Sequence, residues 1–241
     1  ACLDHLNDGK RMIFTLEDPV EYVMKGVRQC QVNHKANVTF SELLRGILRQ
    51  SPDIIMLGEI RDPETAHIAV RAANSGHLVL STLHAPLAVG AVQTMLAFGV
   101  NPYFLANSLI GVVAQRLIRT LSPSTKKMYD ISHAPEIFDE IRPLMEMGQG
   151  NVIYGPDEKD QESQGGYSSR SGLFEVLTID RVLRDMIAAS ATTAELQRYS
   201  VGKGMIDFRR SALLKVAQGN TGVEEMSRAI PSSELFESMD G

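Results

Sequence analysis

The sequence predicts an α/β fold with a mostly parallel sheet, followed by a C-terminal helical region. Short apolar runs alternate with segments of helical spacing in the first half of the chain, as is typical of parallel α/β sheets. Glycine, proline, aspartate and asparagine stand at the boundaries of these segments. After Asp180 the apolar spacing is helical throughout, which indicates that the sheet has ended by then.

The N-terminal part of the chain begins with a helix tail, a strand, an edge strand and a helix, at residues 1–7, 11–16, 27–32 and 39–50. The helix has a clear start, because Thr39 and Glu42 fit the capping-box pattern. Its apolar residues recur at helical spacing from Phe40 to Leu48. Pro52 follows, and the residue before a proline disfavours helix.

Strands and helices then alternate. We expect a strand at 54–60, a helix at 62–74, a strand at 77–83, a helix at 86–98 and a further helix from Asn101-Pro102 to about Arg119. Asp62 followed by Pro63 is typical of a helix start, because aspartate caps the first turn and proline fits the first helical position. A strand that follows each helix predicts parallel pairing.

The chain divides into three expected domains. Residues 1–121 are the α/β core, residues 122–170 a polar region, and residues 171–241 a strand with a helical bundle. The strand is expected at 172–179, and the helices at 180–189, 192–202, 206–218 and 221–229. Residues 156–166 have no apolar side chain beyond proline and are expected to form a mobile loop.

Composition excludes several classes of protein. The chain has 241 residues, 44% of them hydrophobic and 22% charged, which is ordinary for a soluble globular protein. A net charge of -5 gives no electrostatic case for nucleic acid. No apolar run of membrane-spanning length and no signal peptide are found. Cys2 and Cys30 form no CxxC pair, so a reducing cytoplasm fits best.

Polar side chains follow three predicted strands. They are Glu17, Asp18 and Glu21 in TLEDPVEY (15–22), Glu59 after Gly58, and Ser81, Thr82 and His84 in STLHA (81–85). Each group alone fits an ordinary strand-to-loop junction. The carboxyl ends of parallel strands meet at one edge of a sheet, where ligands bind. A carboxylate there could hold Mg²⁺ or orient an attacking water.

Arg45 and Arg49 are neighbours on one stripe of the helix at 39–50. They fit a solvated charged face. They also fit a pair of arginine fingers offered to a phosphate across a subunit boundary.

The phosphate loop GxxxxGK[ST] is missing from the sequence. Gly9-Lys10 and Gly202-Lys203 lack both the earlier glycine and the following serine or threonine. The residues that cradle phosphates are therefore expected to lie outside this chain. It also starts without methionine, in what reads as the middle of a helix, so a fragment of a longer protein is expected.

These motifs resemble the bacterial type II secretion and type IV pilus assembly ATPases, the secretion system protein E family. LRQSPDIIMLGEIRD (48–62) is similar to the family signature over its whole length. TLEDPVEY resembles its aspartate box, and STLHA its histidine box, with Ala85 where threonine is common. GYSSRSGLFEVL (166–177) resembles its glycine-arginine-glycine segment imperfectly. The resemblance covers nearly the whole chain.

The resemblance implies a RecA-like P-loop NTPase core that works on ATP with Mg²⁺. Glu17 would then polarise the attacking water, with Asp18 and Glu21 supporting that site. Glu59 would serve the Walker B function and hold Mg²⁺ through a water molecule.

It implies nucleotide-binding roles for three further residues. Thr82 and His84 would sense the γ-phosphate, and Arg61, with Asp62, would position Glu59 and the helix after it. Arg45 and Arg49 would be finger candidates toward a neighbouring subunit.

Two departures from the family pattern stand out. Assembly ATPases often carry a tetracysteine zinc site after the core, but here the first expected pair falls on Ser122 and Thr125, and no cysteine follows. We therefore expect no zinc site. Without the phosphate loop, this chain alone is expected to be inactive.

The resemblance implies a homo-hexamer at the cytoplasmic face of the inner membrane, with a membrane platform protein and other secretion or pilus components as partners, and no nucleic acid. Its implied function is ATP hydrolysis that powers assembly of a pilus or pseudopilus. Two alternatives stay open at this point: a non-catalytic paralogue or fragment that acts as an interaction module in the hexamer, and a pilus-retraction ATPase of the same superfamily.

Overall fold

The computed structural model describes residues 1–157 and 165–231. The chain divides into two compact units. The first comprises Ala1–Val112 and Thr178–Ser200, and the second comprises Val113–Leu177 and the chain from Val201 on. The expected limits at 121/122 and 170/171 do not coincide with these units, and as domain limits they stay a prediction.

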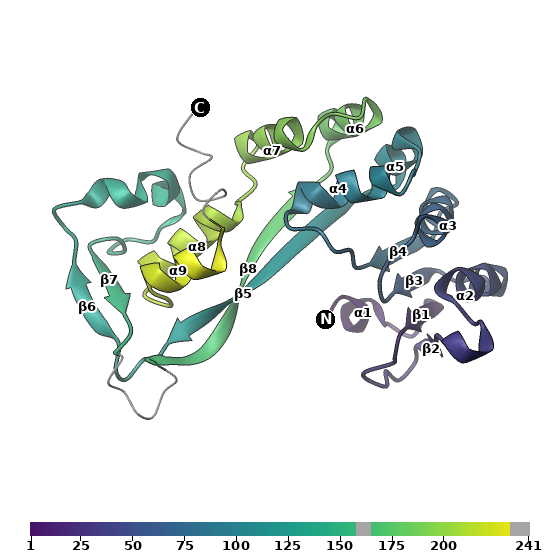
Figure 1. The fold of residues 1–241 in the computed structure, drawn as a ribbon, viewed down its shortest axis with the longest axis horizontal. Helices are drawn as coiled ribbons and strands as arrows, with labels where there is room; N and C mark the ends of the chain where they lie inside the picture. Colours follow the sequence, from purple (N-terminus) through teal and green to yellow (C-terminus); the bar gives the residue numbers. More distant parts are fainter. Residues whose placement is uncertain (158–164, 232–241) are drawn as a thin grey trace. The chain divides into compact units, whose positions relative to one another are not determined.

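The first unit is built on a parallel sheet of order β2-β1-β3-β4 (Figure 1). Its strands are β1 (Ile13–Glu17), β2 (Arg28–Gln31), β3 (Ile54–Leu57) and β4 (Leu78–Ser81). All three neighbouring pairs are parallel. The predicted parallel sheet is therefore confirmed, including the edge position of the strand near residue 28.

The two faces of this sheet are covered differently. On one face Ile13 and Ile54 pack against Leu3, with Leu78 and Leu80 half-buried beside them. The opposite face contains Phe14, Leu16, Ile55 and Leu57, all of them buried. Helix α2 contacts β1 and helix α3 contacts β4. The sheet is thus fixed by burial on both sides, which holds the ends of its strands in register.

The helices of this unit begin where the sequence predicts. They are α1 (Cys2–Leu6), α2 (Phe40–Ile47), α3 (Pro63–Asn74), α4 (Ala88–Ala97), α5 (Pro102–Ser108), α6 (Arg181–Ala188) and α7 (Thr193–Gly202), with short 3-10 turns η1 (His34–Ala36) and η2 (Leu48–Gln50). The Thr39 hydroxyl accepts a hydrogen bond from the Glu42 amide at 3.3 Å. Asp62 accepts one from the Thr65 amide at 2.8 Å. Both predicted caps are confirmed.

The helix predicted from Asn101 to Arg119 is wrong in its second half. Helix α5 ends at Ser108, and β5 (Gly111–Leu121) follows as a strand. Its exposure alternates from residue to residue between Gly111 and Leu117, the period of a strand with one covered face. β-Branched residues are frequent in it, and they favour strand over helix.

The second unit pairs β5 with β8 (Tyr167–Thr178) and adds the antiparallel hairpin of β6 (Lys127–Asp130) and β7 (Val152–Gly155). Between the hairpin strands lies a 3-10 segment, η3 (Pro135–Leu144), and the C-terminal helices are α8 (Phe208–Ala217) and α9 (Val223–Ala229). Phe138 and Ile141 of η3 and Phe208 of α8 are fully buried.

The polar region at 122–170 is therefore more ordered than the sequence suggests, because apolar side chains on η3 pack against α8. Most of the loop expected at 156–166 lies outside the described residues. Within the described ranges, none of the helices combines the length and apolar character that crossing a bilayer requires.

Candidate functional site

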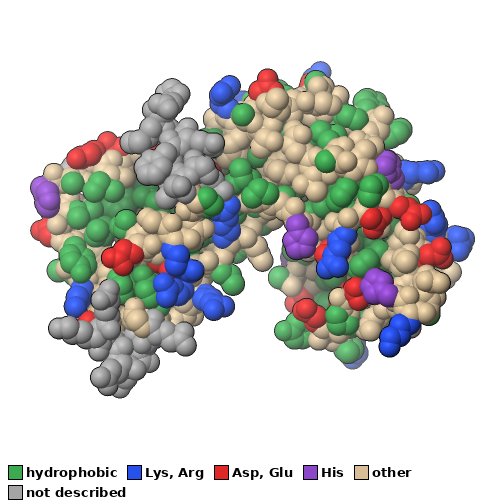
Figure 2. Space-filling model, in the orientation of Figure 1, with side chains coloured by type: hydrophobic (Ala, Val, Ile, Leu, Met, Phe, Trp, Pro, Cys, Tyr) green, Lys and Arg blue, Asp and Glu red, His purple; other side chains and the backbone are tan. Residues whose placement is uncertain are grey.

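The carboxyl ends of β1, β3 and β4 are tied together by their backbones. The Gly58 amide donates to the Leu16 carbonyl at 2.7 Å, and the Ile60 amide donates to the Thr82 carbonyl at 3.0 Å. Parallel register pairs Leu16 with Leu57 and Leu57 with Ser81. The three predicted polar strand ends therefore lie side by side at one edge of the sheet. Figure 2 shows acidic, basic and histidine side chains close together on this unit.

Gly58 sits where a side chain would be crowded by the neighbouring strand. A Cβ atom there would lie 3.1 Å from the Leu16 carbonyl oxygen and 3.5 Å from the Glu17 Cα. The first distance is shorter than an ordinary van der Waals contact, and a backbone atom cannot easily give way. Glycine thus allows β3 to end directly beside β1, which brings Glu59 close to the Glu17 segment.

Glu59 is a largely enclosed carboxylate at this edge. Its side chain is 15% exposed, and its Oε2 lies 2.5 Å from Arg61 Nε and 3.5 Å from His84 Nε2. Arg61 and His84 themselves are 65% and 89% exposed. The site thus has an inner carboxylate with a guanidinium group and an imidazole on its solvent side.

Thr82 and Asp62 serve the backbone around Glu59. The Thr82 hydroxyl donates to the Gly58 carbonyl at 2.6 Å, which joins the ends of β4 and β3. Asp62 accepts hydrogen bonds from both the amide and the hydroxyl of Thr65 at 2.8 Å. Asp62 is therefore a helix cap, and the Thr82 oxygen keeps a lone pair for a ligand.

Glu17 is oriented by two residues that sequence reasoning missed. Its Oε1 accepts hydrogen bonds from the Thr15 hydroxyl at 2.5 Å and from Gln29 Nε2 at 2.9 Å. Thr15 is fully buried, and Gln29 pairs with it across β1 and β2. A buried threonine two residues before a carboxylate on a strand is a sequence signal, because both side chains point to the same face.

The rest of TLEDPVEY is more exposed. Asp18 Oδ2 lies 3.0 Å from His34 Nε2, a partner the sequence did not indicate. Glu21 is exposed, and within the described ranges no hydrogen bond or ion pair engages its carboxylate. The structure therefore brings Glu17 to the tied strand ends and places Asp18 and Glu21 in the loop beyond them.

Arg45 and Arg49 do not join these carboxylates. Both line a separate cleft between α2, η2 and α3. Arg45 is also paired with Glu64 at 2.5 Å. Within one chain they are thus not part of the strand-end site, and both are exposed.

The donor set around Glu59 fits Mg²⁺. Of the described residues, Arg61 and His84 are the ones that form ion pairs with its carboxylate, and both do so through Oε2. Oε1 has no ion-pair partner among the described residues and can accept a hydrogen bond from a water molecule. No group of three or more metal-ligating side chains is found in the described ranges, and Mg²⁺ typically takes one or two carboxylates, with waters and substrate phosphates as its other ligands.

Ser122 and Thr125 stand where the family pattern would have the first pair of zinc-binding cysteines. Hydrogen bonds hold the turn that contains these two residues. The amides of Thr125 and Lys126 donate to the Ser122 carbonyl at 3.3 and 3.1 Å. Lys126 Nζ donates to the Gly219 carbonyl at 2.9 Å and lies 4.1 Å from the Tyr154 ring centre. Polar contacts and a cation–π contact therefore fix this turn.

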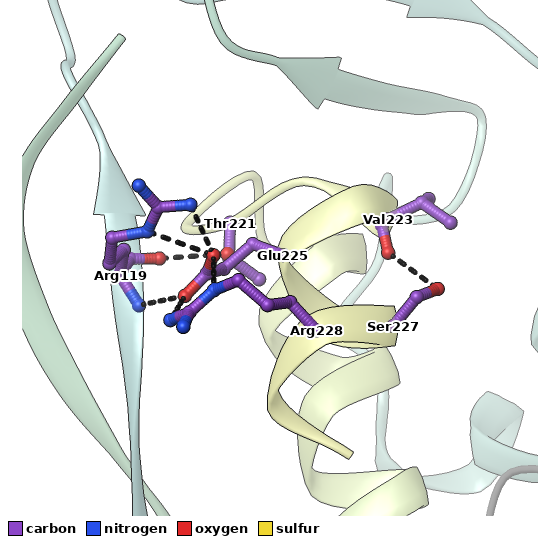
Figure 3. A network of polar contacts seen from close by, with 6 residues as sticks. All are labelled: Arg119, Thr221, Val223, Glu225, Ser227 and Arg228. Carbon is purple, nitrogen blue, oxygen red and sulfur yellow. Dashed lines mark hydrogen bonds and ion pairs between the residues drawn. The ribbon is translucent and has the colours of Figure 1, made fainter. Parts of the chain in front are cut away.

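The second unit contains a buried carboxylate that the sequence did not single out as a site. Glu225 is bound by the guanidinium groups of Arg119 and Arg228 at 2.6–2.9 Å, as Figure 3 shows. The Thr221 hydroxyl also donates to the Arg119 carbonyl at 2.8 Å. Burial raises the pKa of Glu225, but the hydrogen bonds from Arg228 and Arg119 outweigh it and lower that pKa to about 2.

Comparisons with known proteins show the family of this chain. The profile of the family described as Type II/IV secretion system protein matches residues 1–228. This chain belongs to that family. The Type II secretion system protein E of Dickeya dadantii is 42% identical over 228 residues, which are 95% of this chain and 44% of that protein.

Two further similarities bear on the family. The Type IV pilus assembly ATPase TfpB of Acinetobacter baylyi is 36% identical over 219 residues, 91% of this chain and 37% of that protein. The crystal structure of the pilus retraction motor PilT with bound ADP matches with a TM-score of 0.68 and 26% identity, over 98% of this chain and 58% of that chain.

The fold of this family member is thus the RecA-like α/β fold predicted from the sequence, with helices flanking a parallel sheet. The chain spans less than half the length of the curated relatives it matches.

Proposed function

We propose that the protein to which this chain belongs hydrolyses ATP to power assembly of a pseudopilus in type II secretion or of a type IV pilus. The observation that carries the proposal is the meeting of Glu17, Glu59, Thr82 and His84 at the tied ends of three parallel strands. The names of the relatives support the same activity.

In this proposal the chain's own residues orient a water molecule for an in-line attack on the γ-phosphate. Thr15 and Gln29 fix the Glu17 carboxylate, so that it can accept a proton from a water molecule aimed at the γ-phosphate. Glu59 would hold Mg²⁺ through a water molecule, and the ion would supply charge neutralisation at the phosphates. Arg61 keeps Glu59 in one orientation through its Nε at 2.5 Å.

The remaining roles follow from position. Thr82 and His84 stand beside the end of β3 and would sense the γ-phosphate. Asp18 and Glu21 support the Glu17 loop. We propose that Arg45 and Arg49 approach the nucleotide of a neighbouring subunit in a homo-hexamer, because they lie apart from the strand-end site of their own chain.

We further propose that the protein works at the cytoplasmic face of the inner membrane, with a platform protein and other secretion or pilus components as partners. The division into a core at 1–121, a polar inserted region at 122–170 and a C-terminal strand with a helical bundle at 171–241 is kept as a proposal about its domains. This chain alone is proposed to be inactive, since its sequence contains no phosphate loop.

The decisive test is Glu59→Gln in the longer protein that includes a phosphate loop. We expect ATP turnover to fall by about 100-fold or more, because the carboxylate charge at the metal is lost, while ATP binding stays within a few-fold. Glu136→Gln, an exposed carboxylate of η3, is the matched control and should leave turnover unchanged. Normal hydrolysis by the Glu59→Gln protein would refute the site assignment.

A retraction motor is the second candidate, favoured by the similarity to PilT. A non-catalytic module is the third. The genomic sequence that precedes Ala1 separates the module from the enzymes: a glycine-rich GK[ST] loop there supports hydrolysis, and its absence supports the module. Deletion of the gene separates the other two, because loss of assembly leaves no pili and loss of retraction leaves excess pili.

A further inference from the structure

The hairpin of the second unit has one open edge. In the described part of the chain, β6 and β7 form a sheet of two strands, with β6 outermost and β7 on the side of α9 (Figure 1). All four residues of β6 are exposed, whereas those of β7 are half-buried. A Cβ atom at Gly222, just before α9, would lie 3.4 Å from the Tyr154 carbonyl oxygen of β7. The far side of β7 is therefore covered, and the far side of β6 is open.

The register of the hairpin shows which backbone groups face the open edge. The Ile131 amide donates to the Asn151 carbonyl at 2.9 Å, directly after the antiparallel ladder of β6 and β7. Since such bonds recur at every second residue, Tyr129 also directs its backbone groups toward β7. Those of Met128 and Asp130 then point away from β7. Within the described ranges, no hydrogen bond engages the backbone amide or carbonyl of either residue.

A cavity adjoins this edge on one face of the hairpin. Its volume is about 400 Å³, within the range of about 300–1,000 Å³ typical of small-molecule sites. Tyr129 of β6 and Ile153 of β7, which lie opposite each other, line it together with Val223 at the start of α9. Lys127, on the same face of β6, lines it as well. The open edge and the cavity thus belong to the same strand.

The charges of the cavity do not balance. Lys127 Nζ lies 3.0 Å from Asp157 Oδ1, so these two charges offset each other. Glu224 also lines the cavity and is exposed, and no ion pair or hydrogen bond engages its carboxylate among the residues that the structure describes. Asp130, at the end of β6, has no ion-pair partner among them either. A ligand that enters along β6 thus meets aromatic and apolar surface beside unbalanced carboxylates.

We propose that an extended segment of a partner protein adds to β6 as a strand, and that a lysine or arginine side chain of this segment enters the cavity. In strand addition, main-chain hydrogen bonds supply affinity and pockets beside the strand supply specificity. Met128 and Asp130 offer the main-chain groups. The long apolar stem of lysine or arginine suits Tyr129 and Ile153, and its charge suits Glu224.

A second copy of this chain fits the same edge less well. The two lysines that its own β6 segment would bring are both engaged. Lys126 Nζ donates to the Gly219 carbonyl at 2.9 Å, and Lys127 pairs with Asp157. A second β6 would therefore bring no free cation to Glu224, whereas a basic segment of another protein would.

The proposal does not depend on ATP hydrolysis, because every residue of the site belongs to the second unit and Glu59 to the first. The test is fluorescence anisotropy of a labelled, end-capped peptide, Thr-Val-Thr-Lys-Thr-Val-Thr, titrated with the 241-residue chain at low salt and without nucleotide. Threonine and valine favour an extended strand. We expect saturable binding in the micromolar range. The same peptide with glutamate in place of lysine should bind about 10-fold more weakly, the value of one charge-assisted contact.

Matched variants separate the backbone contact from the side-chain contact. Met128→Pro removes an amide that the hairpin does not use and should weaken binding by about 10-fold or more, whereas Met128→Thr keeps that amide and should bind like the parent chain. Glu224→Gln should weaken binding of the lysine peptide by about 10-fold and abolish the preference for lysine over glutamate. Glu136→Gln, an exposed carboxylate of η3, removes the same charge from the same unit and should change neither.

Three results would overturn the proposal. One is the absence of saturable peptide binding up to millimolar concentration. Another is equal binding by the Met128→Pro and Met128→Thr chains, or of the lysine and glutamate peptides. The last is self-association that Met128→Pro abolishes in a chain that binds no peptide, which would assign the edge to a second copy. Circular dichroism of each variant verifies folding, and Glu224→Gln tests the cavity even if Met128→Pro does not fold.

Discussion

Glu225 shows how strongly one buried charge depends on its partners. Its side chain is fully buried, whereas Arg119 and Arg228 are 39% and 59% exposed. The two guanidinium groups reach it from β5 and from its own helix α9, and the ring centre of Tyr167 lies 4.2 Å from the Arg119 guanidinium carbon. The cluster therefore joins a strand and a helix of the second unit through one carboxylate.

Replacing Glu225 by Gln should destabilise the chain by about 2 kcal/mol or more, because two cations lose their shared partner. Urea unfolding at neutral pH measures this. The neighbouring Glu224→Gln is the control, since Glu224 is exposed and its substitution should cost less than about 0.5 kcal/mol. Equal effects of the two substitutions on the free energy of unfolding would contradict a structural role for the buried Glu225 carboxylate.

The same carboxylate predicts a pH dependence. Its pKa in the folded chain is about 2, below the ordinary value of 4.5. A lowered folded-state pKa gives stability that is present above the ordinary value and is lost as the pH falls toward the folded value. The free energy of unfolding should therefore decline between about pH 4.5 and pH 2, and the decline should be shallower in Glu225→Gln.

The roles of residues were predictable where the interacting side chains are close together in the sequence. Glu59 and Arg61 are two residues apart, and their contact follows from the strand end. Gln29 was not predictable as a partner of Glu17, because that contact depends on the pairing of β1 with β2. The cleft that Arg45 and Arg49 line was not predictable for the same reason, because it requires the packing of α2 on α3.

At the scale of elements, two glycines are present for different reasons. One allows two strands to approach closely, and the other only lowers the helix propensity of α2. Gly58 ends β3 against the Leu16 carbonyl, whereas a Cβ atom at Gly46 in α2 would meet nothing within 4 Å. Gly58→Ala should destabilise the chain by about 1–3 kcal/mol through overpacking. Gly46→Ala should stabilise it by about 0.5–1 kcal/mol, because alanine favours helix.

Denaturant unfolding of the two variants beside the parent chain tests this pair. In the longer protein Gly58→Ala should also reduce ATP turnover, since it displaces the backbone beside Glu17. If both alanine variants raised stability alike, the close approach of β3 to β1 would not be the constraint.

Helix starts were predictable because capping is local. Thr39, Asp62 and Asn101 each precede a helix in the structure. The strand β5 was not, because the apolar spacing of residues 102–119 fits a helix and a strand about equally well. Only pairing with β8, distant in sequence, decides for the strand.

At the scale of the whole molecule, the second unit has exposed apolar side chains on β5 and β8, called the apolar row below. Val113 and Leu117 of β5 are 62% and 61% exposed, and Phe174 and Val176 of β8 are 47% and 57% exposed. Apolar patches of this kind promote association. The alternating residues Leu173 and Leu177 are buried, so the pair of strands has one covered face and one open face.

The double variant Leu117→Thr, Phe174→Thr should self-associate less than the parent chain at equal concentration. Its free energy of unfolding should change by about 1 kcal/mol at most, because both residues are exposed and threonine favours strands. Concentration-dependent light scattering and urea unfolding measure the two effects. Leu173→Thr, on the buried face, should instead lower the free energy of unfolding by several kcal/mol. Unchanged scattering of the double variant would refute a role of the apolar row in self-association.

The parallel sheet and its ligand-binding edge were predictable from the alternation of elements. The division into two units was not. Each unit combines segments from both halves of the sequence, and local patterns along the chain do not indicate which distant segments share a core. Phe138 and Phe208 illustrate this, since both belong to the core of the second unit although strands and helices separate them in the sequence.

The segment that begins at Ser122 and returns at Gly166 closes on itself, since the Ser122 amide donates to the Gly166 carbonyl at 2.9 Å. Its two ends leave and re-enter the ribbon of β5 and β8 at one point. An insertion between these positions would therefore leave the paired ends of β5 and β8 in place, whereas loss of the whole segment would also remove the packing of η3 against α8. The same junction is a natural graft point, at which an engineer could insert a reporter or a foreign binding module into a chain of this family.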